Sequence, residues 1–131
     1  SYVFKMSHIE IKSIITGKTL FKGPFASLRE ALEQAVSEGA DLTGANLIGA
    51  DLPAADLPGA DLCHADLSAA NLNGADLTDC DLTGAIMVGT NLSDAILNGA
   101  ILHRTVIFQA NFEGAELENI SGKPYSPNGL I

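Results

Sequence analysis

The chain has 131 residues and a formal net charge of −9 at pH 7, a length that fits one small domain. Two cysteines are too few for a disulfide framework, and no apolar stretch is long enough to cross a membrane, so no membrane association is expected. The acidic charge is concentrated, because residues 40–119 hold twelve Asp or Glu against one basic residue, Arg104. Direct binding of nucleic acid is therefore not expected, since phosphate recognition requires a basic surface.

The N-terminal segment, residues 1–39, begins with the pattern of a β-hairpin. Residues 8–15 and 18–25 are rich in β-branched and aromatic side chains, and they flank the turn sequence Thr16-Gly17-Lys18. Two such runs around a glycine turn predict a pair of antiparallel strands.

A short α-helix is predicted directly after the hairpin. Ser27 and Glu30 have the spacing of a capping box, and Gly39 is a typical stop signal. One face of this helix is apolar and consists of Leu28, Ala31, Leu32, Ala35 and Val36. We expect that face to cover the N-terminal end of the region that follows.

Residues 40–119 repeat one pattern of five residues sixteen times without a gap. Each unit reads small, polar, large apolar, free, free, as in Ala75-Asp76-Leu77-Thr78-Asp79. The large residue is Leu in thirteen units and the small residue is Ala in thirteen. The exceptions keep the size class and are Met87, Ile107 and Phe112 at the large position and Cys80, Thr90 and Thr105 at the small one. A period of five fits neither a helix nor a simple strand, so the chain must coil on a larger scale.

The units match the motif A(D/N)LXX and resemble the pentapeptide-repeat family. This resemblance implies an all-β solenoid, a right-handed quadrilateral β-helix of about four coils, capped by the N-terminal hairpin and short helix. Each unit then forms one side of a square coil, with the small and large residues pointing inward. Glycine recurs at the fifth position, where the corner is expected to need positive φ.

The C-terminal tail, residues 120–131, leaves the repeat. Pro124 and Pro127 predict an irregular conformation. Tyr125, Leu130 and Ile131 are the side chains available to cover the last coil.

On the implied geometry, outward residues twenty positions apart stack into columns on four walls. Acidic ladders result on the first wall, with Asp41, Asp61 and Asp81, and on the fourth, with Asp56 and Asp76. One interpretation is that these charges imitate a DNA backbone, as proposed for family members that bind DNA gyrase. The other is that Asp suits the turn hydrogen bonds of the motif and solubility.

The second wall carries an apolar cluster in its C-terminal half. It consists of Ile86, Val88, Val106 and Phe108. A patch of this kind needs a partner or a cover. Three interpretations remain open: the C-terminal tail folds over it, it is a protein interface or a homo-oligomer contact, or it is simply exposed.

Catalysis, metal binding and cofactor binding are not expected. Cys63, His64 and His103 all belong to the first wall, but Cys63 and His103 are two coils apart, about 10 Å along the axis, too far to share a metal. An interior filled with Leu and Ala leaves no pocket for a catalytic set, and the unbroken five-residue register argues against an acyltransferase built on a six-residue repeat. The sequence therefore predicts a non-enzymatic, cytoplasmic scaffold or protein-interaction module, with a DNA mimic acting on a type II topoisomerase as the alternative.

Overall fold

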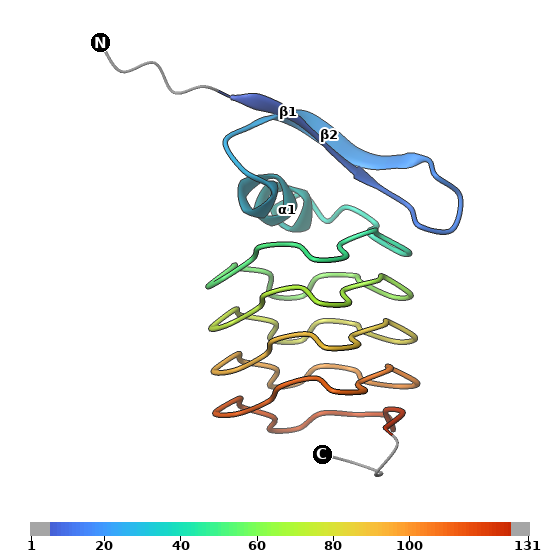
Figure 1. The fold of residues 1–131 in the computed structure, drawn as a ribbon, viewed down its shortest axis with the longest axis vertical. Coiled ribbons are helices and arrows are strands. Elements are labelled where there is room, and N and C mark those ends of the chain that lie inside the picture. The colour runs from blue at the N-terminus through green and yellow to red at the C-terminus, as the bar shows by residue number, and fades with distance from the viewer. Residues whose placement is uncertain (1–5, 127–131) are drawn as a thin grey trace.

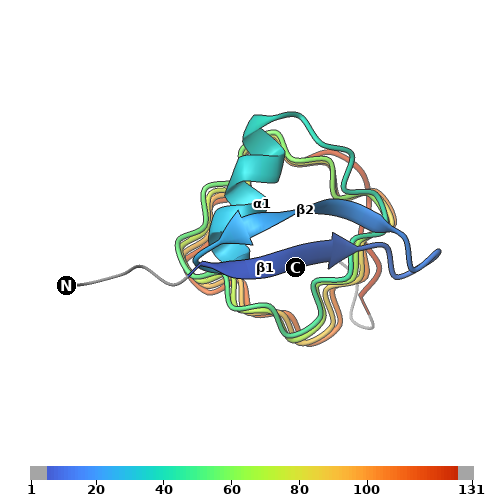
Figure 2. The same ribbon diagram turned by 90° about the horizontal axis from the view of Figure 1, so that it is seen from above.

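The computed structural model describes residues 6–126, and Figure 1 shows a stack of coils with a cap at the N-terminal end. Strands β1 (Ser7–Lys12) and β2 (Thr19–Phe25) form this cap together with helix α1 (Leu28–Ser37). The repeats wind as a right-handed quadrilateral β-helix. Figure 2 shows its square outline along the stack axis, with the hairpin and α1 lying across the opening.

Hydrogen bonds between successive coils hold the stack together. Parallel bridges within the repeats join residues twenty positions apart, so four units make one coil. The Leu72 N–H donates to the Asn91 carbonyl of the next coil at 2.8 Å, and the Asn71 N–H donates to the Ala50 carbonyl of the previous coil at 2.8 Å. Each coil therefore depends on its two neighbours for backbone pairing, as in other solenoids.

The fifth residue of every unit forms a corner and has a positive φ. The prediction made for the glycines is confirmed, with φ between 65° and 74° at the eight corner glycines. The eight other corners adopt the same left-handed conformation without glycine, which costs roughly 1 kcal/mol each. These residues are Ala54, His64, Ala69, Asp79, Asp94, Arg104, Gln109 and Asn119.

The interior of the prism is closely filled by the inward residues. Every large residue from Leu42 to Ile107 is at most 5% exposed, and each contributes about 1.5 to 3 kcal/mol of burial before chain entropy is subtracted. The small-position exceptions Cys80, Thr90 and Thr105 each donate a hydrogen bond to the carbonyl of the large residue 23 positions earlier, at 2.9, 2.7 and 2.6 Å. Their polar atoms are therefore satisfied within the core.

The hairpin is shorter than predicted because its first strand continues into the solenoid. The strand β1 ends at Lys12, and the next residue, Ser13, forms an antiparallel bridge with Ala45 of the first coil. The Asn46 N–H donates to the Lys12 carbonyl at 2.8 Å. The hairpin thus covers part of the open edge that the first coil would otherwise expose.

Helix α1 completes the cap. The Ser27 hydroxyl accepts from the Glu30 N–H at 3.1 Å, while the Glu30 carboxylate accepts from the Ala26 N–H at 2.9 Å. The Glu33 carboxylate accepts from the Asp56 N–H of the first coil at 2.8 Å. The helix residues buried against the coil are Ala31, Leu32 and Ala35. The predicted N-cap and apolar face are therefore present, although the Glu30 carboxylate accepts from Ala26 and not from the N-cap Ser27 as a capping box requires.

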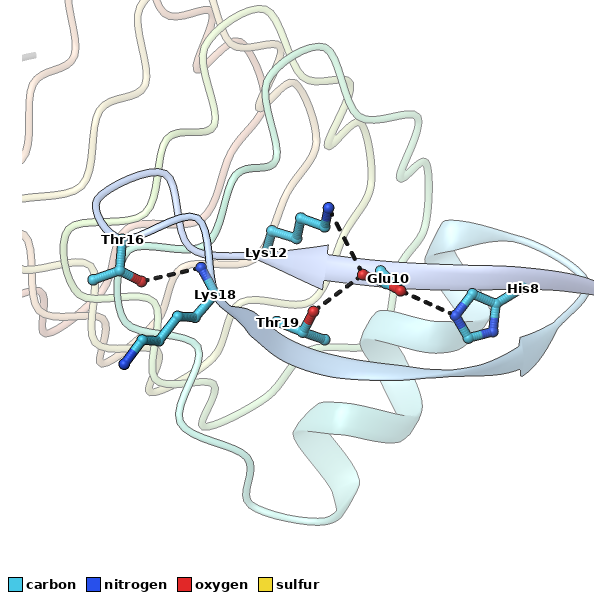
Figure 3. A network of polar contacts seen from close by, with 6 residues as sticks. All are labelled: His8, Glu10, Lys12, Thr16, Lys18 and Thr19. Carbon is cyan, nitrogen blue, oxygen red and sulfur yellow. Dashed lines mark hydrogen bonds and ion pairs between the residues drawn. The ribbon is translucent and has the colours of Figure 1, made fainter.

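Polar contacts on the outer face of the hairpin join its two strands (Figure 3). The Glu10 carboxylate accepts from the Thr19 hydroxyl at 3.0 Å and lies 3.2 Å from His8 Nε2 and 3.9 Å from Lys12 Nζ. The hydrogen bonds from His8 and Thr19 lower the pKa of Glu10. Because these groups are exposed, they contribute little to stability.

The prediction of an irregular tail is wrong for its first residues, which extend the ladder into a partial fifth coil. Ser121 bridges Ile101, and Tyr125 bridges Val106. The second spacing is 19 instead of 20 residues, because the unit after Asn119 contains only four residues before the ladder resumes. Backbone pairing continues although the side-chain pattern has ended.

Candidate protein-interaction surface

The four apolar residues predicted to cluster lie together on the second wall, in the third and fourth coils. Ile86 bridges Val106 in the parallel ladder. The Gly89 N–H donates to the Phe108 carbonyl at 2.9 Å, which places Phe108 beside Val88 in the neighbouring coil. We call Ile86, Val88, Val106 and Phe108 the second-wall patch.

The patch remains accessible in the structure. Ile86 is 37% exposed and Phe108 is 39% exposed, while Val88 and Val106 are half-buried. Ile86 and Val106 lie at bridge positions of the ladder, and Val88 and Phe108 lie in the turns that follow them. Four neighbouring apolar side chains on an acidic rod form the kind of surface that protein partners recognise.

The polar position of the repeat has a structural role that the patch lacks. In most units the Asp or Asn Oδ1 accepts the backbone N–H two residues later; Asp41, for example, accepts from the Thr43 N–H at 3.0 Å. Such Asx turns satisfy a donor that the ladder leaves free. They occur at Asp41, Asn46, Asp61, Asp66, Asn71, Asp76, Asp81, Asn91 and Asn111.

Apolar residues at the polar position give up this hydrogen bond. With Ile86 and Val106 there, the N–H groups of Val88 and Phe108 have no acceptor within residues 6–126. A net contribution of about 0.5 to 1.5 kcal/mol per hydrogen bond is forgone at each site. The apolar column is therefore not the arrangement that backbone hydrogen bonding favours.

The predicted acidic ladders are present as columns. Asp41 bridges Asp61 and Asp61 bridges Asp81 on the first wall, and Asp56 bridges Asp76 on the fourth. All except Asp56 form an Asx turn, and Pro58, two residues after Asp56, has no N–H to donate.

Two of these carboxyl groups have a lowered pKa. The Thr43 hydroxyl and N–H hold the pKa of Asp41 below its usual value. Burial acts to raise the pKa of Asp81, but hydrogen bonds from Thr83 and Cys63 outweigh it, and the pKa is lowered. The charged form of each carboxyl is therefore the one that the fold stabilises.

Neither cysteine is paired or activated as a nucleophile. Cys63 is half-buried on the first wall and Cys80 is buried in the core. Burial raises the pKa of both thiols to about 12, with the Asp81 and Asp61 carboxylates adding to the effect at Cys63. The described part of the chain contains no group of three or more His, Cys, Asp or Glu arranged to hold a metal ion. Nor does any helix within it reach the length and hydrophobicity needed to cross a membrane.

Tyr125, a neighbour of the patch, lies in a different place from the one that the sequence predicts. Tyr125 was expected to cover the last coil, but it is 48% exposed and extends the second-wall column through its bridge with Val106. A strict five-residue count pairs Val106 with Ser126. The unit after Asn119 has only four residues, so Tyr125 takes that place, and the count alone could not predict it. The roles expected for Leu130 and Ile131 lie outside the described residues.

The family described as "Pentapeptide repeats" matches residues 26–57, 54–84 and 85–121, in eight copies. The matched segments cover more than half of the chain. The chain therefore belongs to the pentapeptide-repeat family.

Several solved structures of this family are similar to the chain. A pentapeptide repeat protein of Nostoc, alr5209, is 31% identical over 93% of this chain and 92% of its own, with a TM-score of 0.66. HetL of Nostoc, which is involved in heterocyst differentiation regulation, is 39% identical over 70% of this chain and 42% of its own, with a TM-score of 0.64. Rfr23 of Cyanothece is 32% identical over 61% of this chain and 54% of its own, with a TM-score of 0.60.

The comparisons establish the fold more firmly than the role. The chain spans about half the length of HetL and Rfr23, and no curated protein matches it. Because the motif itself prescribes the inward residues, shared identity reflects a common core as much as a common surface.

Proposed function

We propose that this protein is a non-enzymatic scaffold whose second wall binds another protein or a second copy of itself. The observation that carries the proposal is the second-wall patch, where exposed apolar side chains adjoin one another and where Ile86 and Val106 occupy the position that forms an Asx turn in nine of the sixteen units. These positions give up a hydrogen bond and leave large apolar groups exposed. A partner that covers the patch removes the apolar side chains from water, and it compensates for the missing hydrogen bonds if it also supplies acceptors to the Val88 and Phe108 N–H groups.

The acidic ladders support the alternative, a DNA mimic directed at a type II topoisomerase, less well. Their spacing is regular, but most of the carboxylates already accept a backbone N–H, which accounts for Asp at this position without a ligand. The ladders also end before the last coil, because Ile101 follows Asp81 on the first wall. A gyrase supercoiling assay tests this alternative, and inhibition at micromolar protein would favour it.

The proposal is tested with the double variant Val106→Glu, Phe108→Glu. Its oligomeric mass and the proteins it captures from a lysate of the source organism are compared with those of the wild type. The control is Ile96→Glu, Asn98→Glu, which places two glutamates at the same positions of the repeat on the fourth wall. We expect the first variant, but not the control, to lose a captured partner or to fall to the monomeric mass of 13.6 kDa. Unchanged mass and an unchanged set of captured proteins would overturn the proposal.

A further inference from the structure

The two basic residues that follow residue 39 lie together in one open cavity. Arg104 and Lys123 are the only Lys or Arg residues in positions 40–131, where they are outnumbered by twelve Asp or Glu. Both line a cavity of about 420 Å³ at the C-terminal end of the stack, together with His103, Pro124 and Tyr125. An otherwise acidic rod thus has one site with the charge to attract an anion.

The backbone brings these side chains together. Arg104 occupies a corner with φ of 59°, and its N–H donates to the Lys123 carbonyl at 3.0 Å. Gly122 makes this approach possible, because a Cβ at that position would lie 2.5 Å from the His103 nitrogen. The tail can therefore lie directly against the last coil and carry Lys123 next to Arg104.

Tyr125 orients the guanidinium group of Arg104. The Arg104 Nε donates to the Tyr125 hydroxyl at 3.1 Å, and Arg104 Cζ lies 5.9 Å from the centre of the Tyr125 ring. Among residues 6–126 the terminal guanidinium nitrogens have no acceptor, and neither Arg104 nor Lys123 forms an ion pair. A fixed guanidinium with its terminal nitrogens free is suited to bind a carboxylate with two parallel hydrogen bonds.

The cavity adjoins the second-wall patch. Tyr125 lines the cavity and also bridges Val106, which belongs to the patch. A segment lying on the patch therefore reaches the cavity without a break in the surface. The negative charge of the rod as a whole, with twelve Asp or Glu against one basic residue in residues 40–119, favours a ligand with a single carboxylate over a polyanion, because repulsion grows with the charge of the ligand.

We propose that this cavity binds the carboxylate of an acidic residue in a partner protein, within a segment whose neighbouring apolar side chains pack on the second-wall patch. The inference rests on the proposed function, since it assigns the partner of the same surface a chemical character. The carboxylate fixes the orientation of the segment, while the patch contributes apolar contact area.

The cavity is tested first without the partner, by titrating the ¹⁵N-labelled full chain with small probes. N-acetylphenylalanine supplies a carboxylate beside an apolar ring, N-acetylphenylalaninamide lacks the charge, and inorganic phosphate is the competing anion. We expect the carboxylate to cause saturable shifts at His103, Arg104, Lys123 and Tyr125, and the amide to bind at least about tenfold more weakly. Equal response to carboxylate and amide, no saturable shift, or tighter binding of phosphate would overturn the inference.

The variant Arg104→Gln should remove binding of the carboxylate probe. Glutamine fits this corner, because Gln109 adopts the same conformation with φ of 59°. Lys18→Gln, an exposed position between β1 and β2 in the N-terminal cap, is the control and should bind like the wild type. Full binding by Arg104→Gln would overturn the inference.

The same variant separates this inference from the proposed function. We expect Arg104→Gln to weaken capture of the partner at least about tenfold. If Arg104→Gln captures the partner fully while Val106→Glu, Phe108→Glu loses it, the inference fails and the proposed function stands. If the double variant loses nothing, the proposed function fails, and the probe titration still decides whether the cavity binds a carboxylate.

Discussion

The first and last coils of this solenoid have the same backbone conformation, but their open ends are covered to different extents. The hairpin and α1 cover the first coil, so that Leu42 and Leu47 are at most 1% exposed. In the last coil Phe112 and Leu117 are only half-buried by the described residues. On the first and second walls the outward columns also change along the stack, from Asp and Asn to Ile and Val. The repeat thus supplies a uniform frame, and the features that suggest a partner are confined to its C-terminal half.

Core truncation should give the largest contrast between the two regions. We expect Leu72→Ala, at a position that is 0% exposed, to lower the free energy of unfolding by about 3 kcal/mol. The half-buried Leu117 should lose about 1 kcal/mol in the same exchange, because less apolar surface returns to water. Urea unfolding followed by circular dichroism measures both, and equal losses would show that the last coil is as enclosed as the second.

Two glycines with positive φ test how each end is attached. Gly39→Ala should lower the free energy of unfolding only by the cost of a left-handed backbone at alanine, about 1 kcal/mol, since no atom lies within 4 Å of the added Cβ. Gly122→Ala also brings that Cβ to 2.6 Å from the His103 Cα, so the tail should detach.

Hydrogen exchange distinguishes these outcomes. The N–H groups of Leu102 and Arg104, which donate to Ser121 and Lys123, should lose protection in Gly122→Ala and keep it in Gly39→Ala. Retained protection in Gly122→Ala would contradict the observed tail pairing.

The stability that is lost by having Ile86 in place of an Asx-turn residue can be measured with a reciprocal pair of substitutions. Ile86→Asn restores an acceptor for the Val88 N–H, so we expect no loss of stability and a gain of up to about 1 kcal/mol. Asn71→Ile removes the acceptor of the Asn73 N–H, a 3.0 Å hydrogen bond, and should cost about 1 kcal/mol. Thermal unfolding compares the pair. A marked loss in Ile86→Asn would mean that the patch serves stability.

The smallest expected effect is a pH dependence at Asp81. Its folded-state pKa is lowered, so its contribution to stability is present above the unfolded pKa of about 3.9 and is lost as the pH falls through the folded value. Asp81→Asn keeps an oxygen acceptor and should reduce the loss of stability between pH 6 and pH 3 by well under about 1 kcal/mol. Asp51→Asn is the control, because Pro53 has no N–H to donate. Identical pH profiles for the two variants would contradict this role.

Much of this architecture could be predicted from the sequence, because the five-residue period sets which residues point inward and which stack. The resemblance to the family, and not the spacing, supplied the four sides. The period also located the second-wall patch, since Ile86 and Val106 are twenty residues apart.

The errors lie where a backbone contact occurs without a side-chain signal. Ser13 was predicted to belong to the first hairpin strand, but it pairs with Ala45 of the first coil. Local propensity does not encode such a contact between distant segments. The tail pairs through its backbone although Gly122 stands where a large residue is expected. The basic cavity was missed for the same reason, because only this pairing brings Lys123 to Arg104.

Hydrogen exchange at Val88 and Phe108 tests the central claim most directly. Their N–H groups have no acceptor within residues 6–126, so they should exchange rapidly in the isolated monomer and slowly once a partner or second copy covers the second wall. The N–H groups of Thr43 and Thr83, which form Asx turns on the first wall, should keep their rates. Protection that appears on the first wall and leaves Val88 and Phe108 unchanged would contradict the account.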